Sequence, residues 1–182
     1  MEYIFDVNIN DEDYYKAMVF ANTKTEIGKK SILRMRIYYS IIIFLCCMML
    51  VLVDGFTTLI KVCIIVNIII WIITQIIWIP RLKLRTRKMI KDKRNKGEFM
   101  YSPVSKVEFD DERICNTTSE KKIEMDYSAI VNISICEDDR VIYIQSNLVI
   151  IFILPYRVFV DEKQRQDFID FIKTKVKNIT TY

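Results

Sequence analysis

The stretches Ile37–Val53 (IYYSIIIFLCCMMLVLV) and Val62–Ile79 (VCIIVNIIIWIITQIIWI) decide the fold of this 182-residue chain. Neither contains Asp, Glu, Lys or Arg. A hydrocarbon core about 30 Å thick needs roughly 17–25 apolar helical residues to cross it, so both stretches are long enough for a transmembrane helix. Asp54-Gly55 is a turn signal, and the connection to Lys61 is short. The sequence therefore predicts an antiparallel hairpin of two membrane-spanning helices.

A dense run of positive charge follows the second apolar stretch. Residues Arg81–Lys96 include nine Lys or Arg and one Asp, whereas the flank Thr23–Arg36 before the hairpin has five basic residues and the hairpin loop has one. Basic flanks are retained in the cytoplasm, so we expect both termini there and a multi-pass location in the cell membrane. A basic strip also attracts anionic lipid. The residues expected at the membrane surface are Arg81, Lys83, Arg85, Arg87, Lys88 and Lys91.

Composition argues against several function classes. The chain has no His, and its five Cys form no CxxC spacing, so we expect no zinc site and no other metal or cofactor. No phosphate-binding loop or nucleophile motif occurs, so we expect a non-enzymatic protein without a small-molecule substrate. Residues 98–182 carry 15 acidic and 11 basic groups, which disfavours nucleic acid as a partner. The acidic runs Asp110–Glu112 and Glu137–Asp139 would form a calcium site only if adjacent; solvated turns are the preferred interpretation.

The segment before the hairpin predicts a short strand and a helix. Apolar residues alternate over Met1–Val7. Asn10 is a candidate N-cap, since three acidic residues follow it where the helix dipole favours them. The helix is expected from Asp11 to about Asn22, with Gly28 as a weak point if it continues toward the membrane.

Behind the basic strip, the hydrophobic period changes to two. Alternating runs between Ser102 and Leu154 are separated by acidic turns, which predicts an antiparallel meander. Leu148–Leu154 is apolar on both faces, so it is expected to be a central strand. Asp161 followed by Gln164 resembles a capping box. The final helix is expected to pack Phe168, Ile169 and Ile172 against strand residues such as Ile151 and Ile153.

These elements divide the chain into four expected parts. They are an N-terminal cytoplasmic segment (1–36), the transmembrane hairpin (37–79), a basic juxtamembrane segment (80–97) and a C-terminal domain (98–182). The predicted fold class is an α+β membrane protein whose C-terminal antiparallel sheet, closed by a terminal helix, is of the pleckstrin-homology type.

Two groups of residues are candidate partner contacts. Asn67, Thr74 and Gln75 interrupt the second span, and residues 67, 71, 74 and 78 share one helical face. Polar side chains at this depth usually bond a neighbouring helix, so Asn67 and Thr74 are expected to support helix pairing or homo-oligomerisation. The second group is in the string Leu154–Phe159 (LPYRVF), where Tyr156 and Arg157 are expected on an exposed face. A structural role is favoured for most of that string, with Arg157 free to meet an acidic side chain or a lipid phosphate.

The order of several motifs resembles that of the YcxB-like proteins, a bacterial membrane-protein family. The motifs are FDVNINDEDYYKAMVFAN at Phe5–Asn22, the hairpin with its basic exit, IEMDYSAIVNISICEDDRVIYIQSN at Ile123–Asn147 and VIIFILPYRVF at Val149–Phe159. Tyr156 stands where the family more usually has Lys. The resemblance implies a C-terminal domain like bacterial pleckstrin-like modules, which serve in interaction and assembly, and it implies no enzymatic activity.

Two functions follow as hypotheses. The first is an interaction protein that presents its cytoplasmic domain to a protein or lipid partner from the bacterial inner membrane. The alternative is an immunity or regulatory subunit that acts within the membrane against a toxin or with a transporter.

Overall fold

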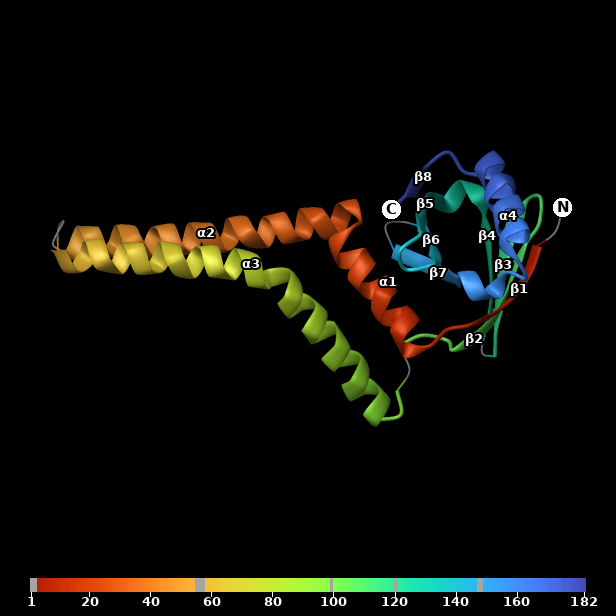
Figure 1. Cartoon of the computed structure of the whole chain (residues 1–182), viewed down its shortest axis with the longest axis horizontal. Helices are drawn as coiled ribbons and strands as arrows, with labels where there is room; N and C mark the ends of the chain where they lie inside the picture. The colour runs from red at the N-terminus through yellow and green to blue at the C-terminus, as the bar shows by residue number, and fades with distance from the viewer. Residues whose placement is uncertain (1–2, 55–57, 99, 120, 147–148) are drawn as a thin grey trace. The chain divides into compact units, whose positions relative to one another are not determined.

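A computed structural model describes residues 3–54, 58–98, 100–119, 121–146 and 149–182 and shows an α+β chain (Figure 1). The α+β class expected from the sequence is confirmed. The α-helices are α1 (Asp11–Thr23), α2 (Glu26–Asp54), α3 (Thr58–Asn95) and α4 (Glu162–Lys175). The strands are β1 (Tyr3–Asn8), β2 (Val104–Phe109), β3 (Arg113–Thr118), β4 (Lys122–Asp126), β5 (Ile130–Cys136), β6 (Val141–Ser146), β7 (Val149–Pro155) and β8 (Ile179–Thr181). Short 3-10 turns, η1 (Tyr127–Ala129) and η2 (Tyr156–Val158), precede β5 and follow β7.

The chain forms two compact units. One unit, here called the domain, combines Met1–Ala21 with Met89–Tyr182. The other, here called the hairpin, is Asn22–Lys88. The residues that the sequence sets apart as an N-terminal segment are thus divided, and β1 with most of α1 belongs to the domain.

The first sheet combines a strand from before the hairpin with three strands from after it. Its strand order is β1-β2-β3-β4, and β1 pairs antiparallel with β2 from Tyr3 opposite Phe109 to Asn8 opposite Val104. In sequence, β1 precedes the hairpin and β2 follows it. The hairpin is therefore an insertion into one folded domain, which the sequence pattern alone does not reveal.

The second sheet has the order β7-β6-β5-β8 and is antiparallel except where β8 pairs parallel with β5. The prediction that the apolar strand near Leu148–Leu154 is central was wrong, because β7 lies at an edge. Its two faces are apolar because each is covered. Phe152 belongs to the main core, whereas Ile153 packs in a second cluster with Phe20 of α1 and Tyr143 of β6.

The main core is built around α4. The Phe168 ring, 1% exposed, lies 5.1 Å from the ring of Phe5, 4.9 Å from that of Phe109 and 5.6 Å from that of Phe159. The expectation that Phe168, Ile169 and Ile172 are buried against the sheet is confirmed, with Ile151 at the edge of the same cluster. The expected contact of this face with Ile153 was wrong. Ile153 points to the opposite face from its neighbours Phe152 and Leu154, and a register shift between β6 and β7 at Ile151 breaks the regular alternation along the strand.

Side-chain caps fix the starts of α1 and α4. The Asp13 amide donates to Asn10 Oδ1 and the Asn10 amide donates to Asp13 Oδ2, each at 2.9 Å, which makes a reciprocal capping box. At α4, the Gln164 amide donates to Asp161 Oδ1 at 2.7 Å. Both N-caps were predicted from the sequence and are confirmed.

In the hairpin, α2 and α3 lie side by side (Figure 1). Among the described residues, two helical segments are long and apolar enough to cross a membrane, Glu26–Met49 and Lys61–Asn95, and their apolar windows are not buried. Helix α3 does not end with the apolar stretch but runs through Pro80 and the basic strip to Asn95. The predicted turn at Asp54-Gly55 falls partly on residues 55–57, outside the described residues.

The hydrogen bonds of the hairpin differ from those predicted. Asn67 Nδ2 donates to the Cys63 carbonyl at 2.9 Å, and Thr74 Oγ1 donates to the Trp71 carbonyl at 2.7 Å, so both bond their own helix. Between the helices, Trp71 Nε1 donates to Ser40 Oγ at 2.8 Å, and Arg36 Nη2 donates to the Gln75 carbonyl at a long 3.5 Å. Trp71 lies on the helical face that the sequence predicts for pairing. It is the Trp71 indole that bonds the neighbouring helix, whereas the Asn67 amide bonds its own helix.

Candidate functional site

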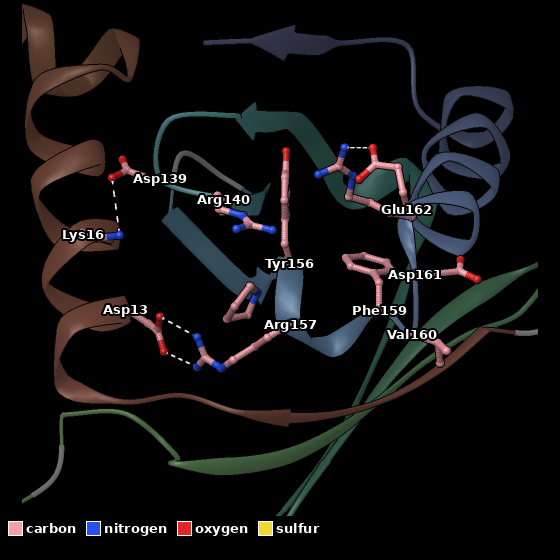
Figure 2. Close-up of a pocket in the computed structure, with 12 residues that line it drawn as sticks. Asp13, Lys16, Asp139, Arg140, Tyr156, Arg157, Phe159, Val160, Asp161 and Glu162 are labelled. Atoms are coloured by element: carbon pink, nitrogen blue, oxygen red, sulfur yellow. Dashed lines mark hydrogen bonds and ion pairs between the residues drawn. The ribbon is translucent and has the colours of Figure 1, made fainter.

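A cavity of about 490 Å³ opens in the domain between the start of α1, the β5–β6 turn, η2 and the start of α4 (Figure 2). We call it the charged cavity, because ionisable side chains from all these elements line it. They are Asp13, Lys16, Asp139, Arg140, Arg157, Asp161, Glu162 and Arg165. Tyr156 also lines it, so the structure brings the two candidates from the LPYRVF string to one cavity with residues of the N-terminal helix.

Arg157 is engaged within the domain and is not free. Its Nη1 donates to Asp13 Oδ1 at 3.0 Å, its Nη2 also contacts Asp13 Oδ2, and Nη2 donates to the Asn8 carbonyl at 2.6 Å. A bidentate guanidinium–carboxylate pair is geometrically specific and strong. The expectation that Arg157 is free was therefore wrong, because its contacts hold η2 against the start of α1. Contact of Arg157 with a partner stays a prediction, and its side chain is 48% exposed.

The same contact controls the charge of Asp13. Burial alone would raise the pKa of this carboxyl, but the Arg157 hydrogen bond, the Asn10 backbone bond and the charges of Arg157 and Lys16 outweigh burial and lower it. In turn, the hydrogen bond to Asp13 raises the pKa of Arg157. The pair is ionised at neutral pH, and the capping box keeps the carboxylate in place.

Two more pairs line the cavity, and one cation stands apart. Lys16 Nζ lies 3.7 Å from Asp139 Oδ1, and the Arg165 guanidinium contacts Glu162. Arg140 is exposed, and its guanidinium makes no hydrogen bond or ion pair within the part of the chain that the structure describes. Its backbone has a positive φ of 52° at the end of the acidic β5–β6 turn. Figure 2 shows its side chain directed toward Tyr156.

Tyr156 forms part of the wall rather than an exposed contact. Its side chain is buried, at 8% exposed, which contradicts the expectation of an exposed face. The Arg165 guanidinium carbon lies 4.0 Å from the centre of the Tyr156 ring, a cation–π geometry. Burial first, and then the Glu137 carboxylate, raise the pKa of Tyr156 to about 12. The phenol is therefore neutral at physiological pH.

Charged groups of both signs dominate the lining of this cavity. Its carboxylates and cations are mostly paired with each other. Among the described residues, no group of three or more His, Cys, Asp or Glu is placed to hold a metal ion. The calcium site considered for the acidic turns thus has no structural counterpart in that part of the chain.

The other predicted contact residues lie in the hairpin. Asn67 and Thr74 are on α3, and the predicted membrane-surface residues Arg81, Lys83, Arg85, Arg87 and Lys88 follow on the same helix. Lys91 continues α3 beyond the hairpin, within the domain. The basic strip is thus one helical segment, and all six of its predicted residues are exposed.

Sequence reasoning missed Asp13, Lys16, Asp139 and Arg140 as cavity residues. Asp13 was interpreted only as an acid in the first turn of a helix, and Asp139 only as part of a solvated turn. Asp13 does lie in the first turn of α1, where it also closes the capping box, and Asp139 lies in the β5–β6 turn. No local signal relates them to Arg157, because 144 positions separate Asp13 from it.

Comparison of the chain with models of protein families, with curated proteins and with solved structures gives no match.

Proposed function

We propose that this protein is a non-enzymatic membrane protein that uses its hairpin as an anchor and its domain as a binding module. The anchor would cross the inner membrane of a bacterial cell twice and leave the domain in the cytoplasm. The module resembles a YcxB-like, pleckstrin-homology-like interaction domain by its sequence motifs, and its contact surface would be the charged cavity.

The observation that carries the proposal is the insertion of the hairpin between β1 and β2. These strands are paired over six residues each, so the chain leaves the domain into the hairpin and returns to the same domain. A chain that crosses a membrane between these points must cross it an even number of times. Two apolar helices supply two crossings, and the nine basic residues at the exit favour the cytoplasm for the domain.

The charged cavity supports a protein partner over a chemical substrate. Its cations and carboxylates come from four elements and are already positioned by mutual pairs, which supplies a preorganised pattern for a complementary charged surface. Arg140 is the group that a partner can engage without disrupting an internal pair of the described residues. An acidic side chain is the matching chemistry.

The alternative, an immunity or regulatory subunit acting within the membrane, is less well supported. It would use polar side chains of the hairpin to contact another membrane protein. Asn67 and Thr74 are already bonded to carbonyls of their own helix.

Two experiments test the proposal. In a cysteine-free background, single Cys at positions 58, 119 and 178 are treated with an impermeant thiol label on intact cells. We expect labelling from outside at 58 alone, and the reverse pattern would contradict the orientation. Position 57, equally suitable for the label, lies outside the described residues.

The binding role is tested by crosslinking in native membranes with the full chain. Replacing Arg140 by Ala should reduce the crosslinked complex, whereas Lys163→Ala, an exposed cation of α4 that does not line the cavity, should not. Equal effects would contradict the charged cavity as the contact surface. Substrate turnover that one polar substitution abolishes would contradict the non-enzymatic role.

A further inference from the structure

A second cavity, of about 150 Å³, lies between α2 and α3 of the hairpin. We call it the hairpin cavity. Two guanidinium groups, those of Arg36 and Arg81, line it together with the aromatic rings of Tyr39 and Trp78. No carboxylate lines it. This charge pattern differs from that of the charged cavity, which both positive and negative side chains line.

Arg36 has hydrogen-bonding capacity that the protein does not use. Its Nη2 donates to the Gln75 carbonyl at a long 3.5 Å, and its Nε is buried with no hydrogen-bond partner among the described residues. A guanidinium carries five N–H donors, and a buried donor left unsatisfied destabilises the protein. The position therefore calls for an acceptor that is not part of the chain.

The hairpin offers no acid that could serve as that acceptor. Between Asn22 and Lys88 the sequence has two carboxylates, Glu26 and Asp54. Glu26 lies 3.6 Å from Lys30, and Asp54 ends α2 far along the helix from Arg36. For Arg81, which is exposed, no ion pair or hydrogen bond is formed within the described residues. Within the described residues of the hairpin, the two positive charges of the cavity thus have no counterion.

The position of the cavity indicates which anion is available. Arg36 immediately precedes the apolar stretch Ile37–Val53, and Arg81 follows Ile79 after one residue. The rings of Tyr39 and Trp78 lie edge to face with centres 5.6 Å apart. Aromatic rings and Arg at the ends of apolar helices occupy the headgroup layer of a bilayer. If the hairpin spans the membrane, as proposed above, the cavity opens at the level of the lipid phosphates.

We propose that the hairpin cavity binds the phosphate of an anionic phospholipid, with Arg36 and Arg81 as the phosphate ligands. Guanidinium groups match phosphate oxygens by bidentate hydrogen bonds. Two positive charges repel the ammonium group of a zwitterionic headgroup but not the glycerol of phosphatidylglycerol, so the site prefers the anionic lipid. Tyr39 and Trp78 contact the lipid beside the phosphate.

The test is native mass spectrometry of the full-length protein in detergent, titrated with phosphatidylglycerol and separately with phosphatidylcholine. We expect a preference for phosphatidylglycerol that the double substitution Arg36→Gln with Arg81→Gln weakens roughly tenfold, on the scale of the contribution of single cations near an anionic surface. The matched control is Lys29→Gln with Arg34→Gln. It removes the same charge at two exposed positions that lie outside both the cavity and the basic strip, and it should retain the preference.

Each outcome decides the proposal. Equal losses in the two double variants would overturn it, because the lipid would then follow net charge and not the cavity. Displacement of the lipid by equimolar inorganic phosphate would also overturn it, since the site would then hold a free ion. The variant Arg36→Lys with Arg81→Lys keeps the charge but lacks the planar fork, so intermediate binding supports the bidentate contact.

The lipid site rests on the membrane location of the hairpin, and alkaline carbonate extraction separates the two failures. A protein that carbonate releases from membranes contradicts the proposed anchor itself. A protein that stays in the membrane and shows no lipid preference contradicts the phosphate site alone. Circular dichroism of each variant confirms that the helices are intact.

Discussion

The domain and the hairpin use the same apolar residue types in opposite ways. In the domain, large side chains such as Phe5, Phe109 and Phe168 are at most 2% exposed. In the hairpin, Phe44 is 63% exposed, Ile69 50% and Ile76 70%. Burial from water stabilises a fold by about 25 cal/mol per Å² of apolar surface, so the domain gains this contribution internally. The apolar side chains of the hairpin are exposed, so the hairpin gains this stabilisation only if an apolar phase such as a bilayer surrounds it.

The polar groups show the corresponding contrast. Cations of the charged cavity are mostly matched by carboxylates from other elements, whereas those of the hairpin cavity are not. The domain is therefore nearly complete as a folded unit. The described residues of the hairpin leave both apolar surface and cations without such matches.

The largest expected effect comes from removing a buried ring of the domain. Phe168→Ala should lower the free energy of unfolding of the domain by about 3–5 kcal/mol, because the ring is fully enclosed by other aromatic rings. Hydrogen exchange of the β1–β2 pair in the full-length protein measures it. Val160→Ala, at an 86% exposed position, is the control and should change stability by less than about 0.5 kcal/mol. Unchanged exchange in Phe168→Ala would show that α4 is not docked.

The next largest effect comes from placing a charge on the exposed apolar surface of the hairpin. Ile69→Lys places a charge at an exposed position near the middle of the apolar stretch Val62–Ile79 and should disfavour membrane insertion by about 2.5–3.5 kcal/mol. The fraction of protein resistant to carbonate extraction should fall, while Ile69→Leu should leave it as it is. A soluble hairpin would tolerate the added charge, so equal extraction of the two variants would contradict the anchor.

A smaller effect sharpens the role of the charged cavity. Asp13→Asn weakens the pair with Arg157 and should destabilise the domain by about 1–2 kcal/mol at neutral pH, near the low end for charged hydrogen bonds because Arg157 is half exposed.

The pH dependence gives a second readout of the same variant. The folded pKa of Asp13 is lowered, so its contribution is complete above the ordinary value of 3.8 and is lost as pH falls through the lower folded pKa. Denaturation midpoints of the parent and Asp13→Asn, compared at pH 6 and near pH 3, should converge in acid. A constant difference would show that ionisation of Asp13 does not stabilise the fold.

The smallest effect concerns the contact between α2 and α3. Trp71→Phe keeps most of the ring but removes the donor to Ser40, and hydrogen bonds between membrane helices average about 0.6 kcal/mol. Unfolding in mixed micelles, followed by the fluorescence of Trp78, measures the loss. Asn67→Leu is the comparison, since Asn67 bonds its own helix, and a larger loss there than in Trp71→Phe would contradict the observed pairing.

Local sequence determined the features whose partners lie within a few positions. The apolar helices, the alternation of the strands, and the caps at Asn10 and Asp161 follow from residue types at fixed spacings, because backbone geometry repeats every 3.6 or two residues. Edge and central strands look alike at this level, so the apolar pattern of β7 predicted a central strand although α1 covers its second face.

Only the tertiary structure decided what distant segments do together. The pairing of β1 with β2 makes the hairpin an insertion, and the contact of Asp13 with Arg157 turns a helix-capping acid into part of a cavity. The unsatisfied Arg36 likewise depends on where α3 places Gln75 and Arg81. Long-range contacts of this kind form because the closed core compensates the entropy of ordering the chain, and no periodic signal in the sequence records which partner each residue meets.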